Sequence, residues 1–206
     1  MSFTGFTNED FDVFSIDGLE PRMEGLKTQI RPKLEALGEE ISPTLSTLTG
    51  DEMFYHVAKH ARRTINPPKD TWVAFANNKR GYKQHPHFQI GLWETHVFIW
   101  FAVIYEAPFK QEFATTLLKN IENIQSMIPS DFVWSLDHTK PDVIKMDELN
   151  RVELEKMFHR LETVKKAEIL CGMTISREQA VSMSQEEWTN VLNHIFDKLT
   201  PLYKLS

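Results

Sequence analysis

Three consecutive segments between residues 72 and 105 are dense in aromatic and β-branched side chains, and they constrain the fold more than any other part of the chain. These segments are 72–76, 88–93 and 97–105. Such side chains favour β-strands, because they pack well on a pleated, half-buried surface. The third segment is apolar on both faces, which predicts a central strand with helices covering at least one side.

The turn between the second and third segments predicts how they pair. If Glu94 and Thr95 form a two-residue turn, residue 93 pairs with 96, 91 with 98, 89 with 100 and 87 with 102. Paired residues share a face of the sheet. One face should therefore carry His87, Gln89 and Trp100, and Gly91 opposite Phe98 should leave room for the aromatic ring.

Apolar residues recur at helical spacing in the sequence both before and after these three segments. Helices are predicted over 7–14, over 19–37 with a bend or a split at Pro32, and over 108–128, 150–164 and 184–199, and further strands over 53–61, 132–134 and 168–175. Ser42-Pro43 and Thr49-Gly50 should mark the exit from the N-terminal helices, and Pro201 should follow the last one. The pattern predicts a single α+β domain over 1–206, in which helices cover a mainly antiparallel sheet. Its parts are a helical N-terminal segment (1–50), the main sheet (51–106), and helices with additional strands (107–206).

Composition narrows the class of protein. The chain has 206 residues, of which 41% are hydrophobic and 25% charged, enough for a substantial core. The N-terminus lacks the pattern of a signal peptide, and the longest apolar run, 97–105, is too short to span a bilayer, so we expect a cytoplasmic protein with no membrane partner. Cys171 is the single cysteine and lies in an apolar segment, so we expect neither a disulfide nor a reactive thiol. An isoelectric point near 5.8 makes nucleic acid an unexpected partner.

Positive charge is concentrated between residues 56 and 96. This segment holds five of the eight histidines and seven Lys and Arg residues against two acids, in a chain of net charge −6. A cluster of this kind raises the local potential whatever the net charge. It is typical either of an anion-binding surface or of the solvated rim of a sheet.

The strongest candidate site lies in the connection 77–84, where Gly81 allows a backbone conformation with positive φ. Basic side chains there suit charge-assisted hydrogen bonds to phosphate or carboxylate. Arginines just before the 72–76 segment, histidines before and on the next strand, and an aromatic floor complete the site. The candidate ligand-binding residues are Arg62, Arg63, Lys79, Arg80, Tyr82, Lys83, His85, His87 and Trp100. The expected ligand is an anionic small molecule; the alternative is a basic hairpin tip that protects a sheet edge.

Two other functions stay open at this point. His85 and His87 project to the same side of a strand, so with His56 or His60 they could hold zinc in a metal-assisted hydrolase. The His56–His60 spacing matches that of zinc proteases, but Val57 stands where their catalytic Glu would be, and we expect neither a metal nor a cofactor. A third reading is a structural domain whose aromatic face contacts a partner chain. No catalytic motif is present, and the oligomeric state is left open.

Several of these segments resemble the YktB-like family of uncharacterised proteins from Gram-positive bacteria. The resemblance is carried by 54–75, by Lys79-Arg-Gly-Tyr-Lys83 and by 85–92, with similar stretches at 6–11 and from Gly172 to the C-terminus. It implies a compact cytosolic α+β domain. It implies no particular activity, cofactor or catalytic residue.

Overall fold

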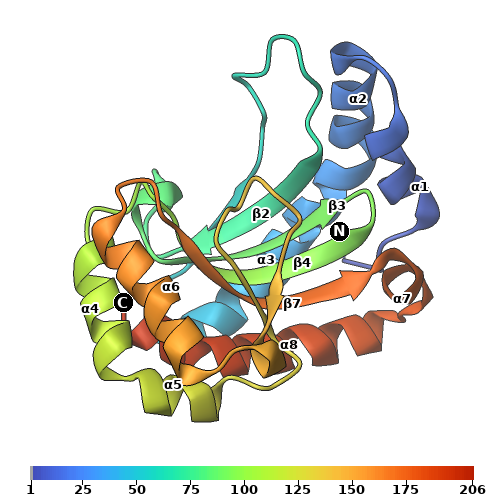
Figure 1. Cartoon of the computed structure of the whole chain (residues 1–206). Helices are drawn as coiled ribbons and strands as arrows, with labels where there is room; N and C mark the ends of the chain where they lie inside the picture. The colour runs from blue at the N-terminus through green and yellow to red at the C-terminus, as the bar shows by residue number, and fades with distance from the viewer. Residues whose placement is uncertain (1) are drawn as a thin grey trace.

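A seven-stranded antiparallel sheet forms the centre of the molecule (Figure 1). The computed structural model describes residues 2–206. The strand order is β1-β2-β3-β4-β7-β5-β6, and every neighbouring pair is antiparallel. The strands are β1 (Phe54–Val57), β2 (Asp70–Ala76), β3 (His87–Trp93), β4 (His96–Val103), β5 (Val133–Ser135), β6 (Ile144–Lys145) and β7 (Ile169–Ser176). The predicted α+β class and antiparallel sheet are confirmed.

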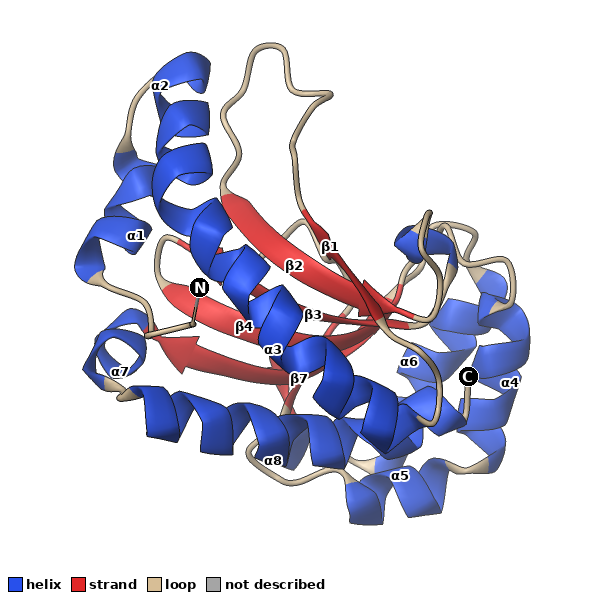
Figure 2. Ribbon diagram, turned by 180° about the vertical axis from the view of Figure 1, so that it is seen from behind, coloured by secondary structure: helices blue, strands red, loops and turns tan. Residues whose placement is uncertain are grey.

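Long helices cover one face of this sheet, which we call the helix face. The helices are α1 (Asn8–Asp12), α2 (Leu19–Gly25), α3 (Arg31–Thr49), α4 (Lys110–Lys119), α5 (Ile121–Met127), α6 (Arg151–Thr163), α7 (Arg177–Ser182) and α8 (Gln185–Lys204). Seen from behind, α3 and α8 cross this face (Figure 2). Val73, Phe88 and Phe101 point into the main core there. None of the helices over residues 2–206 combines the length and the apolar content needed to cross a membrane.

The register predicted from the Glu94-Thr95 turn is confirmed. Gln89 pairs with Trp100, His87 with Ala102 and Gly91 with Phe98. A Cβ atom at residue 91 would lie 2.2 Å from Cζ of Phe98, so the glycine does make room for the ring. The strand β4 is central, as expected, because β7 pairs with its other edge.

Prolines do not end helices where the sequence predicts. The helix α3 continues through Pro43 to Thr49, and α8 continues through Pro201 to Lys204. Both prolines are exposed, while the apolar stripe of each helix continues past them. Water can therefore satisfy the carbonyl that each ring leaves free, and packing keeps the helix intact. The interruption expected at Pro32 takes the form of a π-helical turn (Leu26–Ile30) between α2 and α3.

Other element boundaries differ from the predictions in smaller ways. The strand expected over 53–61 is confirmed only for β1, and the helix expected over 108–128 is divided into α4 and α5 at Asn120. Two short elements, β6 and α7, were not predicted. Both are too short to show a period of apolar residues in the sequence.

Candidate functional site

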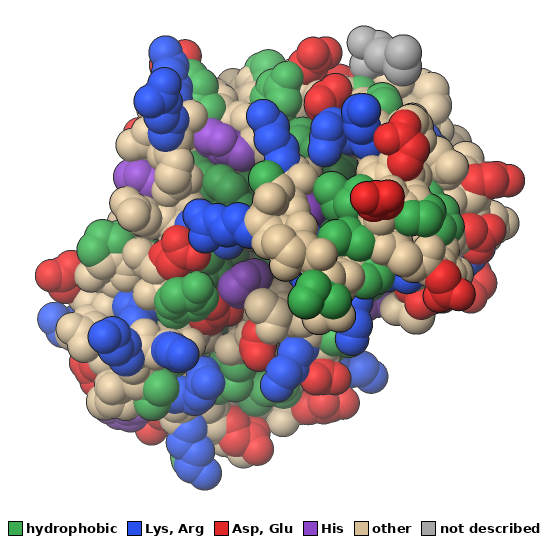
Figure 3. Space-filling view, turned by 90° about the horizontal axis from the view of Figure 1, so that it is seen from above, with side chains coloured by type: hydrophobic (Ala, Val, Ile, Leu, Met, Phe, Trp, Pro, Cys, Tyr) green, Lys and Arg blue, Asp and Glu red, His purple; other side chains and the backbone are tan. Residues whose placement is uncertain are grey.

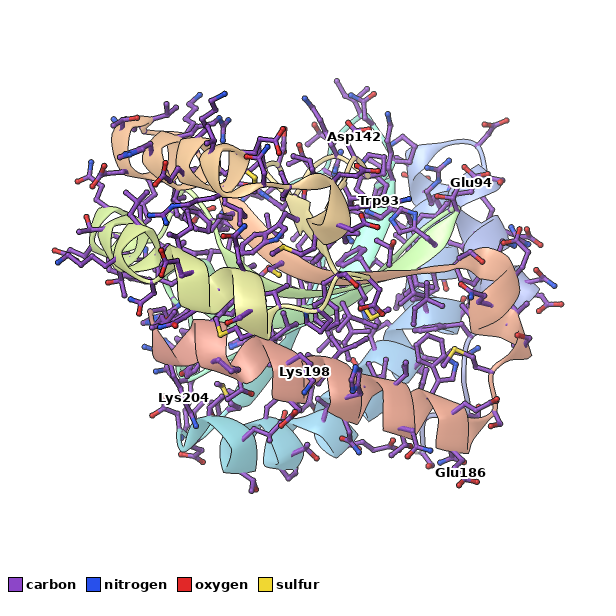
Figure 4. The ribbon with its side chains drawn as sticks, turned by 60° about the horizontal axis from the view of Figure 1, so that its bottom comes forward. Trp93, Glu94, Asp142, Glu186, Lys198 and Lys204 are labelled. Carbon is purple, nitrogen blue, oxygen red and sulfur yellow. The ribbon has the colours of Figure 1, made fainter. Side chains whose placement is uncertain are left out.

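The opposite face of the sheet carries no long helix, and we call it the loop face. Three loops, 58–69, 77–86 and 136–143, connect its strands. Trp93 lies on the side of the sheet away from α8, whereas Glu186 and Lys198 point from α8 to the solvent (Figure 4). A second apolar cluster lies on the loop face and contains Trp93, Phe98, Trp100, Ala102, Ile104, Val133 and Leu170, with Trp72 packed against it. Viewed from above, histidine and basic side chains gather around a hollow among apolar ones (Figure 3).

His87 is buried completely and both of its ring nitrogens are used. Its Nδ1 lies 2.8 Å from the carbonyl oxygen of His85, so Nδ1–H donates to that oxygen, and Nε2 accepts from the amide of Gln89 at 2.9 Å. Burial lowers the pKa of His87 to about 4, so the ring is neutral at physiological pH. His87 is therefore part of the framework of the site.

This hydrogen bond predicts a cost for changing Gln89. In Gln89→Leu the buried Nε2 of His87 loses its donor, so we expect the free energy of unfolding to fall by about 1–3 kcal/mol. Urea denaturation measures the change. Gln111→Leu on the exposed surface of α4 is the control and should change stability by less than about 0.5 kcal/mol. Equal losses in the two variants would contradict the structural role of Gln89.

Tyr82 connects the 77–86 loop to the sheet. Its hydroxyl oxygen accepts a hydrogen bond from Nε1 of Trp72 at 2.9 Å, and its ring stacks on His56 and meets His87 edge-on. Burial raises the pKa of Tyr82 to about 12, so the hydroxyl stays protonated. These contacts hold the loop over the sheet, and they leave the hydroxyl proton of Tyr82 available to a ligand.

Asp70, the first residue of β2, is the least expected feature of the loop face. The residue is only 8% exposed, and its carboxylate accepts no hydrogen bond from any other described residue. Burial raises the pKa of Asp70 to about 6, opposed by the positive charges of His138, Arg63 and Lys83. A carboxyl group with so little access to water is costly to ionise, and residues with strongly shifted pKa values concentrate at functional sites.

His138 comes from the 136–143 loop and is fixed by Glu168, at the start of β7. Oε2 of Glu168 lies 2.7 Å from Nδ1 of His138 and 3.0 Å from its backbone nitrogen, so both N–H groups donate to one oxygen. The Glu168 side chain is 5% exposed and that of His138 is 16% exposed. This arrangement leaves Nε2 of His138 without a hydrogen-bond partner among the described residues.

We define the polar centre as the loop-face residues that these contacts and charge effects link: Arg63, Asp70, Tyr82, Lys83, His87, His138 and Glu168. Asp70 is subject to the charges of Arg63, Lys83 and His138, and His87 to those of Lys83 and His138. Lys83 also pairs with Glu106 at 3.6 Å. Each of the three loops therefore contributes at least one residue whose charge acts on Asp70.

The sequence-predicted residues divide into two groups. Arg63, Tyr82, Lys83 and His87 belong to the polar centre. Of the others, Lys79 lies 5.1 Å from the centre of the Phe54 ring at the outer edge of the sheet, and Trp100 is packed in the second apolar cluster at 6% exposure. Arg62, Arg80 and His85 lie on the loops, where no described contact links their side chains to Asp70. Gly81 has the expected positive φ, +67°.

The histidines proposed for a metal do not share a site. Nε2 of His56 lies 3.0 Å from the carbonyl oxygen of Asn78, Nε2 of His60 lies 3.1 Å from Oγ1 of Thr71, and both nitrogens of His87 are used. Within residues 2–206, the one group of three or more such side chains with ligand atoms within 4.8 Å of one another is Asp137, His138 and Glu168. The hydrogen bonds from His138 to Glu168 already account for this group. Zinc bound by His85 and His87 gains no support from the geometry.

The sequence does not predict Asp70, His138 or Glu168 as site residues. A weak signal existed for Asp70, since it is one of only two acids in the basic segment and opens a strand. Glu168 likewise precedes an apolar strand. His138 carries no signal of its own, because its partner is 30 residues away and the pair forms only in the folded chain.

Two surface hollows flank β1 at the opposite edge of the sheet from β6. The first, of about 450 Å³, is lined by Arg31, Glu35, Tyr55, His56, Val57 and Lys59. The second, of about 470 Å³, includes Phe54, Lys79 and several residues of α3. Both are open to solvent, and the acids that line them, Glu35, Glu39 and Glu52, are exposed, unlike Asp70. The polar centre is therefore the better candidate.

Comparisons with known protein families and with individual proteins identify the same family. The family described as "Domain of unknown function (DUF1054)" matches residues 6–203. A UPF0637 protein of Bacillus licheniformis and one of Bacillus velezensis are each 57% identical over 206 residues, covering 100% of this chain and 98% of the relative. A UPF0637 protein of Bacillus cytotoxicus is 54% identical over 205 residues, covering 100% and 99%. These matches confirm the resemblance to a family of uncharacterised proteins of Gram-positive bacteria, and the chain belongs to the DUF1054 family.

Proposed function

We propose that this protein binds a small anionic ligand at the polar centre of the loop face. The observation that carries the proposal is Asp70, a carboxyl group on a residue only 8% exposed, whose charge is opposed by the positive charges of three side chains from three loops. Arg63 and Lys83 are suited to a phosphate or carboxylate group, because charge-assisted hydrogen bonds to such groups are strong. When protonated, Asp70 can itself donate a hydrogen bond to an anion.

The surroundings of the cations limit the size of the ligand. Lys83 is held near the site by Glu106, and Tyr82 is fixed by Trp72 and His56. The floor below them is closed by His87 and Gln89, which bond to each other. These contacts support a small ligand bound between the loops, rather than a polymer lying across the sheet.

Sulfate is a suitable probe, because its charge is constant over the pH range of interest. In calorimetric titration with sulfate at about pH 5, we expect Arg63→Ala and Lys83→Ala each to weaken binding about tenfold, the equivalent of about 1.4 kcal/mol. Wild-type binding should also weaken between about pH 5 and about pH 8, because Asp70 becomes negatively charged over this range.

Two neighbouring basic residues provide matched controls. Arg62→Ala and Arg80→Ala remove the same kind of charge from the same loops, but neither charge acts on Asp70. Each should leave sulfate affinity within about twofold, and all four variants should keep stability within about 0.5 kcal/mol. The proposal fails if wild-type protein does not bind sulfate, or if the controls lose as much affinity as Arg63→Ala and Lys83→Ala.

We also assign the protein to the cytoplasm. Cys171 is a free, buried thiol, and burial raises its pKa well above the ordinary value. A fold without disulfides is typical of a reducing compartment.

A further inference from the structure

We propose that Asp137, His138 and Glu168 together bind one divalent metal ion of the zinc type, beside the start of β7. One ligand atom from each side chain lies within 4.8 Å of the other two, and residues 2–206 contain no other such group of three. Two carboxylates and one imidazole suit transition-metal ions such as Zn²⁺, and three protein ligands leave a position for water. The metal site uses neither Arg63 nor Lys83, on which the proposed anion site depends.

The pairing of β5 with β7 brings the two carboxylates together. Ser135 pairs with Leu170 at the end of this antiparallel ladder, so two residues further along each chain Asp137 lies opposite Glu168. Leu170 belongs to the apolar cluster of the loop face, and Glu168, two residues before it, is on the same side of the sheet. His138 follows directly, and its backbone N–H donates to Oε2 of Glu168 at 3.0 Å. The sheet itself therefore sets the spacing of the three groups.

Glu168 has too little positive charge around it for a buried carboxylate. The residue is 4% exposed, and among the described residues its one ion pair is with His138. Its second oxygen, Oε1, accepts no hydrogen bond from a described residue. Lys110 does not bond to it, because Nζ of Lys110 donates instead to three carbonyl oxygens, those of Leu161, Val164 and Ala167. Buried charges in proteins are usually paired or coordinate a metal, and Oε1 is available for a metal.

Asp137 offers a second carboxylate oxygen from a fixed side chain. Its Oδ1 accepts hydrogen bonds from the backbone N–H of Thr139 at 3.0 Å and from the hydroxyl of Thr139 at 2.6 Å. Its Oδ2 lies 3.6 Å from Nζ of Lys140, whose side chain is 63% exposed. Exposed pairs of this kind contribute little energy, so a metal ion can displace Lys140 from Oδ2.

His138 binds the ion by changing its tautomer. Nδ1–H donates to Oε2 of Glu168 at 2.7 Å, and Nε2 has no hydrogen-bond partner among the described residues. When the ion takes the lone pair of Nδ1, the proton moves to Nε2, and the neutral ring loses no proton overall. Two atoms that each bind zinc at about 2.1 Å in tetrahedral geometry lie roughly 3.4 Å apart. Nδ1 and Oε2 therefore need to separate by less than about 1 Å, which side-chain rotation allows.

Calorimetric titration of untagged, full-length protein with Zn²⁺, after removal of metals with a chelator, tests the site. Wild-type protein should bind one Zn²⁺ ion, and Mg²⁺ should bind far more weakly because it prefers oxygen ligands. Asp137→Asn, His138→Gln and Glu168→Gln should each weaken Zn²⁺ binding by more than about tenfold, since even residues that only position a metal ligand contribute this much. Asp137→Asn keeps the test valid if the other two variants fail to fold, because the Asp137 side chain is 42% exposed.

The nitrogen NMR signals of the histidine rings give a second measurement. Saturation with Zn²⁺ should move the proton of His138 from Nδ1 to Nε2. The signals of His159 should not change in this way, because His159 pairs with Glu162 at 3.3 Å on α6 but has no third ligand group.

His159→Gln is the matched control for binding, and it should bind Zn²⁺ as wild type does. The proposal is overturned if wild-type protein binds no Zn²⁺, or if Asp137→Asn and His159→Gln bind it equally well, which would show an adventitious ion only. It is also overturned if the proton of His138 stays on Nδ1 when Zn²⁺ is saturating.

Discussion

Phe101→Ala should lower the free energy of unfolding by about 3–5 kcal/mol, because a ring is lost from the centre of the main core. Phe101 lies on the central strand β4 and is 2% exposed. Its ring contacts Phe88 on the neighbouring strand and Phe113 on α4. Truncation therefore leaves a cavity where the sheet meets the helices. Chemical denaturation measures the loss.

Trp100→Ala on the opposite face should cost a similar amount. Trp100 stacks with Phe98, and Gly172 on β7 lets β4 and its side chains approach closely, since a Cβ there would lie 1.9 Å from the carbonyl oxygen of Ile99. Tyr105→Ala is the control, because Tyr105 is exposed and its truncation should cost less than about 0.5 kcal/mol.

The comparison of Trp100 with Phe101 decides the role of the apolar cluster. Equal losses would show that Trp100 supports the site from below, as its burial indicates. If Trp100→Ala loses no more stability than Tyr105→Ala, Trp100 would instead line a ligand-binding surface, as the sequence predicts.

The central sheet could be predicted because its pairing depends on local features. A two-residue turn at Glu94-Thr95 and alternating side chains determine the register of β3 and β4 without reference to the rest of the chain. The ends of α3 and α8 could not be predicted from Pro43 and Pro201. Their continuation depends on which side of the helix the proline occupies and on the core packed against the other side, and both are tertiary properties.

The candidate site could be predicted only in part, for the same physical reason. The basic loops and His87 are local in sequence, so their charge and strand position were visible. Asp70 and His138 are 68 positions apart, and nothing in either local sequence indicates the other. The expected roles also changed, because burial made His87 and Trp100 part of the framework and made Asp70 a reactive candidate.

Asp70→Asn should stabilise the protein at pH 8 by about 3 kcal/mol. The pKa of Asp70 is about 6 in the folded state, whereas the ordinary value for an aspartate, which applies to the unfolded state, is 3.8. Between these two pH values the folded protein therefore keeps a proton on Asp70 that the unfolded chain has lost. Stability therefore falls as pH rises through this window, by about 1.4 kcal/mol per pH unit. Asn has no proton to lose and avoids this cost.

The prediction can be tested by measuring how the stability difference between Asp70→Asn and wild type changes with pH. Below about pH 4 both forms of residue 70 are neutral, so the two proteins should unfold at nearly the same urea concentration. The difference should grow between about pH 4 and about pH 6 and then remain constant. Asp137→Asn is the control: hydrogen bonds from Thr139 lower the pKa of Asp137, so this variant should be less stable than wild type above the titration range.

The same variant separates function from folding. If replacing Asp70 makes the protein more stable and removes the pH dependence of sulfate binding, the protein carries this acid for a purpose other than stability. If Asp70→Asn destabilises the protein at pH 8, the carboxylate has a structural partner in solution. The polar centre would then lose the feature on which the proposed anion site depends.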